Sequence, residues 1–289
     1  MKTSMVKSLR LKSPAKVNLR LEILRRREDG YHQLRTILQK ISLCDTLSVS
    51  LEKEKGITIT THHPDLPLGK KNLVYRAAQM ILNKSEYKGG LHIDIRKEIP
   101  LGAGLGGGSS NAAATLKALN QLLEIGLPTK ELMKMGLGIG ADVAFFLLEG
   151  AAVATGIGER LKKIELPDLW YVLLNPNFEV STRWAYQNFV LTKRHFHFNV
   201  QGFVKTPEEI SRLLWNDLEG VVSEKYPQIE GMKQMLLSAG ALGALMTGSG
   251  PTVFGFFSGK REAEKAYKKL ESTVRTRGWI IRKTRSLPT

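Results

Sequence analysis

The chain has 289 residues, of which 42% are hydrophobic, enough for one large domain or two ordinary ones with a sizeable core. Its formal net charge of +16 favours anionic partners such as nucleotides, phosphorylated metabolites or nucleic acid. Cys44 is the only cysteine, no apolar run is long enough to span a membrane, and the first residues lack the apolar core of a signal peptide. These features exclude an intrachain disulfide and a thiolate metal cluster, and they predict a soluble cytoplasmic protein without membrane contacts.

The first half of the chain is predicted to begin with strands. Apolar and polar residues alternate over 16–23, which is the period of a half-buried strand, with Lys16 and Asn18 on its polar face. The same kind of pattern predicts strands at 46–52, 56–62, 90–100 and 150–156 and helices at 72–83, from about Ser110, and at 128–136.

Beyond Pro167 the succession of strands and helices starts again. Strands are expected at 169–177, 251–257 and 279–284, and helices at 206–220, 230–240 and 261–277. We therefore expect an α+β protein of two domains, residues 1–160 and 161–289, each a sheet covered by helices. Residues 258–289 hold ten Lys or Arg against three Glu but few aromatic residues, which indicates a solvated basic surface and disfavours nucleic acid as the partner.

Five glycines lie within the eight residues 101–108, followed by two serines. Each glycine costs about 0.5–1 kcal/mol relative to Ala in a regular element, and a plain turn needs only one or two. The pattern therefore predicts a place where bare backbone must approach a ligand. A helix starting near Ser110 would direct its positive end at an anion, and Ser109 or Ser110 would cap it, donate to phosphate oxygens or ligate a metal.

Three familiar glycine motifs are excluded. A Walker loop needs Lys after the glycines, but Ser109 follows Gly108. The dinucleotide fingerprint matches over 102–107, yet the expected helix is followed by a second helix instead of a parallel strand ending in an acid. The nucleophile elbow GxSxG is absent. A phosphate-binding loop of another design remains.

Five segments carry a family resemblance, and they occur in a fixed order: PAKVNLRLEI (14–23), DGYHQLRT (29–36), IPLGAGLGGGSSNAA (99–113), GADVAFF (140–146) and MTGSGPTVFG (246–255). Together they resemble the GHMP kinase superfamily and, within it, the 4-diphosphocytidyl-2-C-methyl-D-erythritol kinases, over residues 13–279. The resemblance implies a ribosomal-protein-S5-like N-terminal domain and a ferredoxin-like α/β sandwich. It also implies ATP-dependent phosphorylation of the substrate's 2-hydroxyl group in non-mevalonate isoprenoid precursor biosynthesis.

The same resemblance makes Lys16 and Asp142 the catalytic pair. Asp142 would accept or orient the proton of the acceptor hydroxyl, and Lys16 would keep that carboxylate ionised and stabilise developing charge. From the residues alone, an N-cap is a common role for an Asp placed like Asp142, and the strand pattern by itself favours a solvated face for Lys16. Ala144 stands where the family usually carries Pro.

The remaining expected contacts also come from the resemblance. Tyr31 would stack on the cytosine base, His32 would hydrogen-bond its edge, Tyr186 would cover its other face, and Mg²⁺ would be held by the ATP phosphates and Ser110. The ATP site would comprise Asn72 and Lys97, at positions near the adenine, together with Gly102, Gly104, Leu105, Gly106, Gly107, Gly108, Ser109 and Ser110. The acceptor site would comprise Asn18, Tyr31, His32, Asp142, Thr182, Tyr186, Gly248 and Ser249.

Alternative functions come from other classes. Another GHMP kinase, such as a homoserine or mevalonate kinase, is disfavoured by the DGYH and PAKxNL segments. An RNA-binding protein would suit the basic charge but has no need of the glycine-rich helix start together with Lys16 and Asp142. The intact Asp142 disfavours an inactive regulator. A monomer and a homodimer are both compatible with the sequence.

Overall fold

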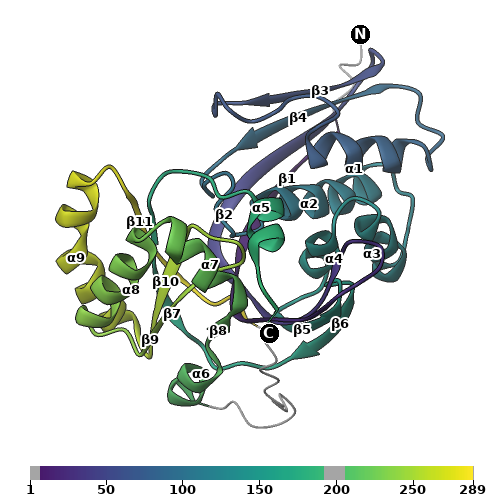
Figure 1. Cartoon of the computed structure of the whole chain (residues 1–289). Coiled ribbons are helices and arrows are strands. Elements are labelled where there is room, and N and C mark those ends of the chain that lie inside the picture. Colours follow the sequence, from purple (N-terminus) through teal and green to yellow (C-terminus); the bar gives the residue numbers. More distant parts are fainter. Residues whose placement is uncertain (1–6, 192–205, 289) are drawn as a thin grey trace. The chain divides into compact units, whose positions relative to one another are not determined.

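The computed structural model describes residues 7–191 and 206–288 of the chain, which form two compact units (Figure 1). The first unit comprises residues 7–15, Cys44–Leu101 and Gly106–Leu148. The second comprises Lys16–Leu43, Gly102–Leu105 and the described residues from Glu149 onward. The units are interleaved in sequence, since the strands β1 (Ser8–Arg26) and β2 (His32–Glu52) each contribute to both. The boundary expected after residue 160 stays a prediction. None of the helices in the described ranges has the length and apolarity needed to cross a membrane.

The first unit is a small sheet with four helices. Strand β4 (Gly90–Arg96) is central: it runs antiparallel to the second half of β2 (His32–Glu52) and parallel to β3 (Gly56–Thr61). The helices are α1 (Leu73–Leu82), α2 (Gly107–Leu122), α3 (Thr129–Leu137) and α4 (Ala141–Leu147). Helix α2 packs against each of the other three helices.

The second unit contains two groups of strands. In the first group β5 (Ala151–Gly156) pairs antiparallel with β6 (Arg160–Ile164) and with the first half of β2, while β1 (Ser8–Arg26) pairs parallel with β8 (Trp215–Asn216). The second group is an antiparallel sheet in the order β11-β7-β10-β9. Its strands are β7 (Trp170–Asn175), β9 (Gly243–Met246), β10 (Val253–Phe257) and β11 (Ile280–Arg285).

Helices α8 (Gln228–Ser238) and α9 (Lys260–Thr276) pack on this antiparallel sheet. The buried residues of α9 recur every three or four positions, which gives the helix one apolar stripe, and its basic residues lie outside that stripe. The helix therefore buries its stripe against the sheet and exposes most of its Lys and Arg, as expected for a solvated basic surface. The stripe consists of Ala263, Ala266, Leu270 and Val274.

The single helix predicted over 206–220 is wrong, because the chain forms α6 (Pro207–Leu213), β8 and α7 (Asp217–Lys225) there. Arg20 donates to the carbonyl of Leu213 at 2.9 Å, which satisfies a carbonyl in the last turn of α6. Asn216 then caps α7, its Oδ1 accepting from the Leu218 amide at 3.0 Å. The pairing of β8 with β1 is a long-range contact, and helical periodicity carries no signal for it.

The polar face of β1 was expected to be solvated, and this expectation is also wrong. Lys16 and Asn18 are each 4% exposed, and Arg20 and Glu22 each 6%. Arg20 and Arg35 both bind the Glu22 carboxylate, each at 2.5 Å. Alternation therefore separates an apolar face from a polar face, both of which are buried.

We predict that Glu22→Gln removes part of the acid sensitivity of folding. Burial alone would raise the pKa of Glu22, but hydrogen bonds from Arg35 and Arg20 outweigh it and hold that pKa below the usual value for a glutamate side chain. A carboxylate with a lowered folded pKa stabilises the protein above its unfolded pKa, and this contribution disappears as pH falls through the folded value. At pH 7 the variant should be about 1–3 kcal/mol less stable.

Urea unfolding at pH 7 and at successively lower pH from about 4.5 downward checks this prediction, and the stability gap should narrow as the pH falls. Glu131→Gln is the control, because its ion pair with Lys134 lies on the surface and contributes little. A difference in unfolding free energy between Glu22→Gln and the wild type that stays the same at every pH would contradict the prediction.

Candidate active site

Helix α2 begins at Gly107, three residues before the predicted start near Ser110. Its N-cap is Gly106, whose φ of 71° lies in the left-handed region, and no side chain caps the helix. Ser109 and Ser110 are therefore inside the first turn and are not caps. The first N–H groups of an uncapped helix lack intrahelical acceptors, and with the helix dipole they form a ready site for an anion.

The glycines of the loop serve different needs. Gly102, Gly104 and Gly106 have positive φ values of 57°, 74° and 71°. A Cβ on Gly104 would also lie 2.2 Å from the backbone oxygen of Thr247, so this glycine is required by a contact within the second unit. From the sequence, all of these glycines were expected to make room for a ligand. The structure instead gives Gly104 a role in the fold.

Gly108 has no such internal requirement. It is a helical residue without a positive φ, it is exposed, and a Cβ there would meet only Leu73, at 3.8 Å. Glycine within a helix is about 0.5–1 kcal/mol less favourable than alanine. The space next to Gly108 at the uncapped helix start fits a polyphosphate that needs close access to the backbone.

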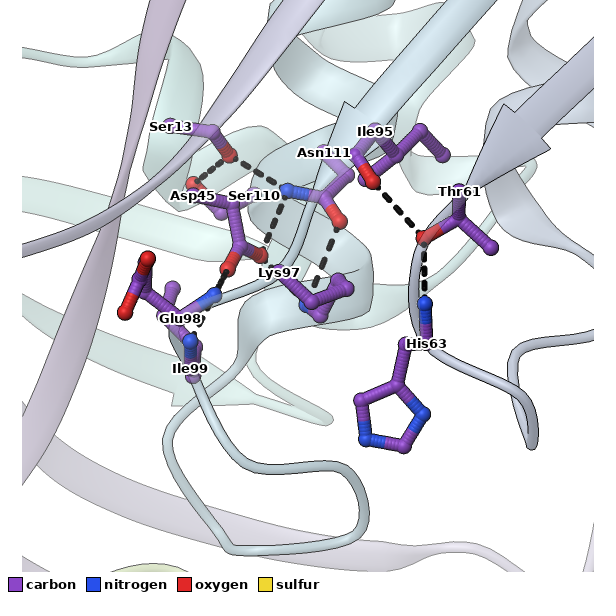
Figure 2. A network of polar contacts seen from close by, with 10 residues as sticks. All are labelled: Ser13, Asp45, Thr61, His63, Ile95, Lys97, Glu98, Ile99, Ser110 and Asn111. Carbon is purple, nitrogen blue, oxygen red and sulfur yellow. Dashed lines mark hydrogen bonds and ion pairs between the residues drawn. The ribbon is translucent and has the colours of Figure 1, made fainter.

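A buried polar network, the Asp45 network, lies beside this helix start in the first unit (Figure 2). The Asp45 carboxylate accepts from the amides of Glu98 and Ile99, at 2.8 and 2.9 Å, and pairs with the Lys97 ammonium. It also accepts from Asn111 Nδ2 at 2.9 Å. The members of the network are Ser13, Asp45, Lys97, Ser110 and Asn111.

Two expected ATP residues belong to this network, and a third stands apart from it. Lys97 is placed at the helix start, because a Cβ on Gly107 would lie 3.1 Å from its Nζ atom. Ser110 is 1% exposed and accepts from Ser13 Oγ at 2.8 Å. Asn72 instead caps α1: its Oδ1 accepts from the Val74 amide at 2.9 Å and its Nδ2 donates to Pro67 at 2.6 Å.

The sequence argument did not single out Asp45, Ser13 or Asn111. Asp45 directly precedes the strand predicted over 46–52, so its place inside the long strand β2 was not apparent from the sequence. Ser13 and Asn111 are likewise not marked in the sequence, because their role depends on partners far away along the chain.

Lys16 and Asn18 contact the loop of residues 247–250, which holds two further glycines, within the second unit. Lys16 Nζ donates to Asn18 Oδ1 at 2.5 Å and to the carbonyl of Gly104 at 2.8 Å. The backbone N–H of Asn18 donates to Thr247 Oγ1 at 2.9 Å. A Cβ on Gly248 would lie 3.3 Å from Lys16 Nζ, so this glycine lets the loop approach the buried ammonium.

The expected acceptor residues form two pairs in the same unit. Thr182, the first residue of α5 (Thr182–Asn188), hydrogen-bonds Ser249 at 2.9 Å. The rings of His32 and Tyr186 lie 5.2 Å apart between centroids, at 35°. Tyr31, next to His32, has 62% of its surface exposed. Burial, and secondarily the nearby charge of Arg26, lowers the pKa of His32, which favours a neutral ring able to donate and accept at once.

Asp142 is the second residue of α4 and is half-buried. The N-cap of that helix is Gly140, so capping does not explain the acid. Ala144 is fully buried in the middle of α4, where alanine suits the helix and the usual proline is not needed. Lys16 belongs to the second unit and Asp142 to the first, so their pairing stays a prediction.

Known proteins with similar sequences and folds cover the whole chain. Residues 72–150 match the GHMP kinases N-terminal domain, and residues 200–276 match the GHMP kinases C-terminal domain. A 4-diphosphocytidyl-2-C-methyl-D-erythritol kinase from Geobacter metallireducens is 46% identical over 98% of this chain and 100% of its own.

Solved structures agree with the sequence match. A crystal structure of a 4-(cytidine 5'-diphospho)-2C-methyl-D-erythritol kinase has a TM-score of 0.81 at 35% identity, covering 96% of this chain and 100% of the other. A homoserine kinase from Cytophaga hutchinsonii shares the fold, with a TM-score of 0.76 at 24% identity, over 100% and 97% of the two chains.

The two matched domains make the protein a kinase of the GHMP type, with the α+β fold class predicted from the sequence. Within that class, the chain belongs to the 4-diphosphocytidyl-2-C-methyl-D-erythritol kinase family. Membership confirms the resemblance read from the five segments and implies ATP as the phosphoryl donor.

Alanine substitutions at Gly104 and at Gly108 should have different effects, because Gly104 is required by the fold whereas Gly108 is expected to face the nucleotide. Gly104→Ala should destabilise the fold by about 2 kcal/mol or more, because positive φ alone costs roughly 1–2 kcal/mol and the Cβ overlaps the Thr247 carbonyl. Gly108→Ala should leave stability unchanged or raise it by up to about 1 kcal/mol, yet weaken ATP binding. Thermal unfolding and nucleotide titration of both variants check this, and unchanged ATP affinity in Gly108→Ala would contradict it.

Proposed function

We propose that this protein transfers the γ-phosphoryl group of ATP to the 2-hydroxyl group of 4-diphosphocytidyl-2-C-methyl-D-erythritol, in non-mevalonate isoprenoid precursor biosynthesis. The uncapped start of α2 with open space at Gly108 carries the donor side of this proposal. The acceptor is proposed from the name of the relatives, which match nearly the full length of the chain. We also propose a cytoplasmic location, where ATP is available and the lone Cys44 stays reduced.

The donor site is proposed to lie at the first turn of α2. The amides of Gly107, Gly108 and Ser109 would bind phosphate oxygens. Lys97 adds a positive charge beside Gly107, and Asn72 directly precedes Leu73, the residue that a Cβ on Gly108 would meet at 3.8 Å. These residues fit a triphosphate because they combine amide donors, a cation and room for close approach.

Mg²⁺ bound to ATP would neutralise charge on the phosphates. Ser110 is the residue of this chain proposed to contact the ion. Its oxygen has two lone pairs and gives one to Ser13, so one remains for a metal. The described residues contain no group of three His, Cys, Asp or Glu side chains arranged to hold an ion, so the phosphates would supply most ligands.

The acceptor is proposed to bind through the second unit. Tyr31 presents an exposed ring for stacking, and His32, a neutral ring that packs against Tyr186, can donate to and accept from the edge of a base. The Thr182–Ser249 pair and the Gly248 backbone supply hydroxyl and amide donors for the diphosphate.

The chemical step needs a group that takes or orients the proton of the acceptor hydroxyl. Asp142 is the proposed group, because it is the acid of the GADVAFF segment (140–146) and lies half-buried in the first turn of α4. Lys16 is buried and held by two oxygen atoms, which fixes the position of its charge where negative charge would develop. Phosphoryl transfer depends mostly on such positioning and charge stabilisation.

A panel of acceptor alcohols tests the proposed reaction. ADP release should be measured with 4-diphosphocytidyl-2-C-methyl-D-erythritol, with the same alcohol lacking the cytidine diphosphate group, with homoserine and with mevalonate. Only the cytidylylated alcohol should support efficient turnover. Preference for homoserine or mevalonate would replace the proposed acceptor by that of another GHMP kinase.

Tyr31→Ala should lose base stacking worth roughly 1–3 kcal/mol, by analogy with base–aromatic stacking elsewhere. The KM for the cytidylylated acceptor should rise accordingly, and the KM for ATP should not change. Tyr31→Phe keeps the ring and is the matched control. Equal losses for both substrates would move Tyr31 out of the acceptor site.

Asp142→Asn keeps the size of the side chain but removes its charge and its basicity. We expect kcat to fall roughly 10²-fold or more, in line with general-base contributions, with ATP affinity and melting temperature near wild type. Lys16→Met should lower kcat similarly, and the double variant should be little worse than either single one. Glu149→Gln, just beyond α4, is the control. A near-normal kcat in Asp142→Asn would overturn the mechanism.

A further inference from the structure

We infer that Asp45 is a positioning residue for the phosphoryl donor: it holds Lys97 at the start of α2 and sets the direction of the Ser110 hydroxyl through Asn111 and Ser13. This inference rests on the proposed function only as far as nucleotide binding is concerned. Asp45 lies outside every segment on which the family resemblance was based.

The first step is the burial of the Asp45 carboxylate. Asp45 is 0% exposed, and its two oxygens accept from two backbone amides, from Asn111 and from Lys97. A buried carboxylate is tolerated when its charge is paired and its oxygens are hydrogen-bonded, and both conditions are met here. The reciprocal effect is that the Lys97 ammonium, 5% exposed, keeps a fixed place.

The second step is that one carboxylate joins the two flanks of the glycine-rich segment. Glu98 and Ile99 come just before that segment in the chain, and Asn111 comes just after its last glycines, in the first turns of α2. Their bonds to Asp45 measure 2.8, 2.9 and 2.9 Å. Asp45 therefore fixes the position of the helix start relative to the strand end that precedes it.

The charge of Asp45 sets the direction of the hydrogen bonds in the network. An ionised carboxylate only accepts, so Asp45 requires the NH₂ group of Asn111 to face it. The second N–H of that group donates to Ser13 Oγ at 2.8 Å. Ser13 Oγ accepts this bond and donates its own proton to Ser110 Oγ at 2.8 Å (Figure 2).

The consequence falls on Ser110. Its oxygen already accepts from Ser13, so its own proton is directed to a different acceptor, and phosphate oxygens at the helix start would provide one. The same geometry turns the amide oxygen of Asn111 toward Lys97, at 3.4 Å. One buried charge thus orders a donor set of hydroxyl and ammonium groups suited to a polyphosphate.

The test uses the full chain and the non-hydrolysable nucleotide AMP-PNP with Mg²⁺. Calorimetric titration gives the dissociation constant, thermal unfolding gives stability, and steady-state kinetics gives separate KM values for ATP and the acceptor. The variants are Ser13→Ala, Asp45→Asn and Asp45→Asn/Lys97→Met. Asp94→Asn is the matched control, because Asp94 is an exposed acid on β4 of the same unit.

Ser13→Ala breaks the chain of hydrogen bonds without touching the Asp45 carboxylate. It should raise the dissociation constant for AMP-PNP about threefold to tenfold, the worth of one oriented hydrogen bond, and the acceptor KM should not change. Asp45→Asn should raise the dissociation constant for AMP-PNP further. Its melting temperature should fall and partly recover in the double variant, because removing Lys97 as well leaves no unpaired buried charge.

The outcomes separate the inference from the proposed function. If wild type and Ser13→Ala bind AMP-PNP equally well, the Asp45 network only supports the fold and the inference is overturned. This holds even where Asp45→Asn fails to fold. If wild type binds AMP-PNP but phosphorylates no cytidylylated acceptor, the proposed function fails while the inference stands or falls on the variants. A wild type that binds no nucleotide overturns both.

Discussion

The ion pair between Asp45 and Lys97 is the interaction on which the start of helix α2 depends. It buries one charge of each sign next to the first turn of α2 and recruits two backbone amides and an asparagine to satisfy the carboxylate. Removing either partner would leave an uncompensated buried charge, which is strongly destabilising. A rigid helix start follows, and rigidity there is what a phosphate-binding site requires, because phosphoryl transfer depends on positioning.

The glycine-rich segment is therefore not a uniform loop. Gly104 is needed because the Thr247 carbonyl leaves no space for a Cβ, and Gly106 because the N-cap takes a left-handed conformation. Gly108 meets neither condition, because it has no positive φ and a Cβ there would meet only Leu73, at 3.8 Å. The glycines of this short stretch are therefore present for different physical reasons, and a substitution series has to treat them one by one.

The second unit also contains buried polar groups. Lys16, Asn18 and Thr247 are linked in the second unit, and Arg20, Glu22 and Arg35 form an ion cluster farther along β1. Such groups remain stable inside because each is satisfied by a partner of opposite charge or by a hydrogen bond. The strand that presents Lys16 is thereby fixed on both faces. A fixed charge loses little reorganisation energy when negative charge develops near it.

The sequence alone determined the family, the fold class and most strands and helices, because periodicity is local and because the five segments carry specific residue types. It also pointed to Lys97 and Ser110, which belong to the Asp45 network, and to His32 and Tyr186, whose rings lie 5.2 Å apart; their roles in binding stay predictions. Only the tertiary structure decided that residues 206–220 break into two helices, that both faces of β1 are buried, and that Asp45 and Ser13 support α2. Each of these depends on partners distant along the chain, such as β8 on β1, and neither periodicity nor local composition encodes such partners.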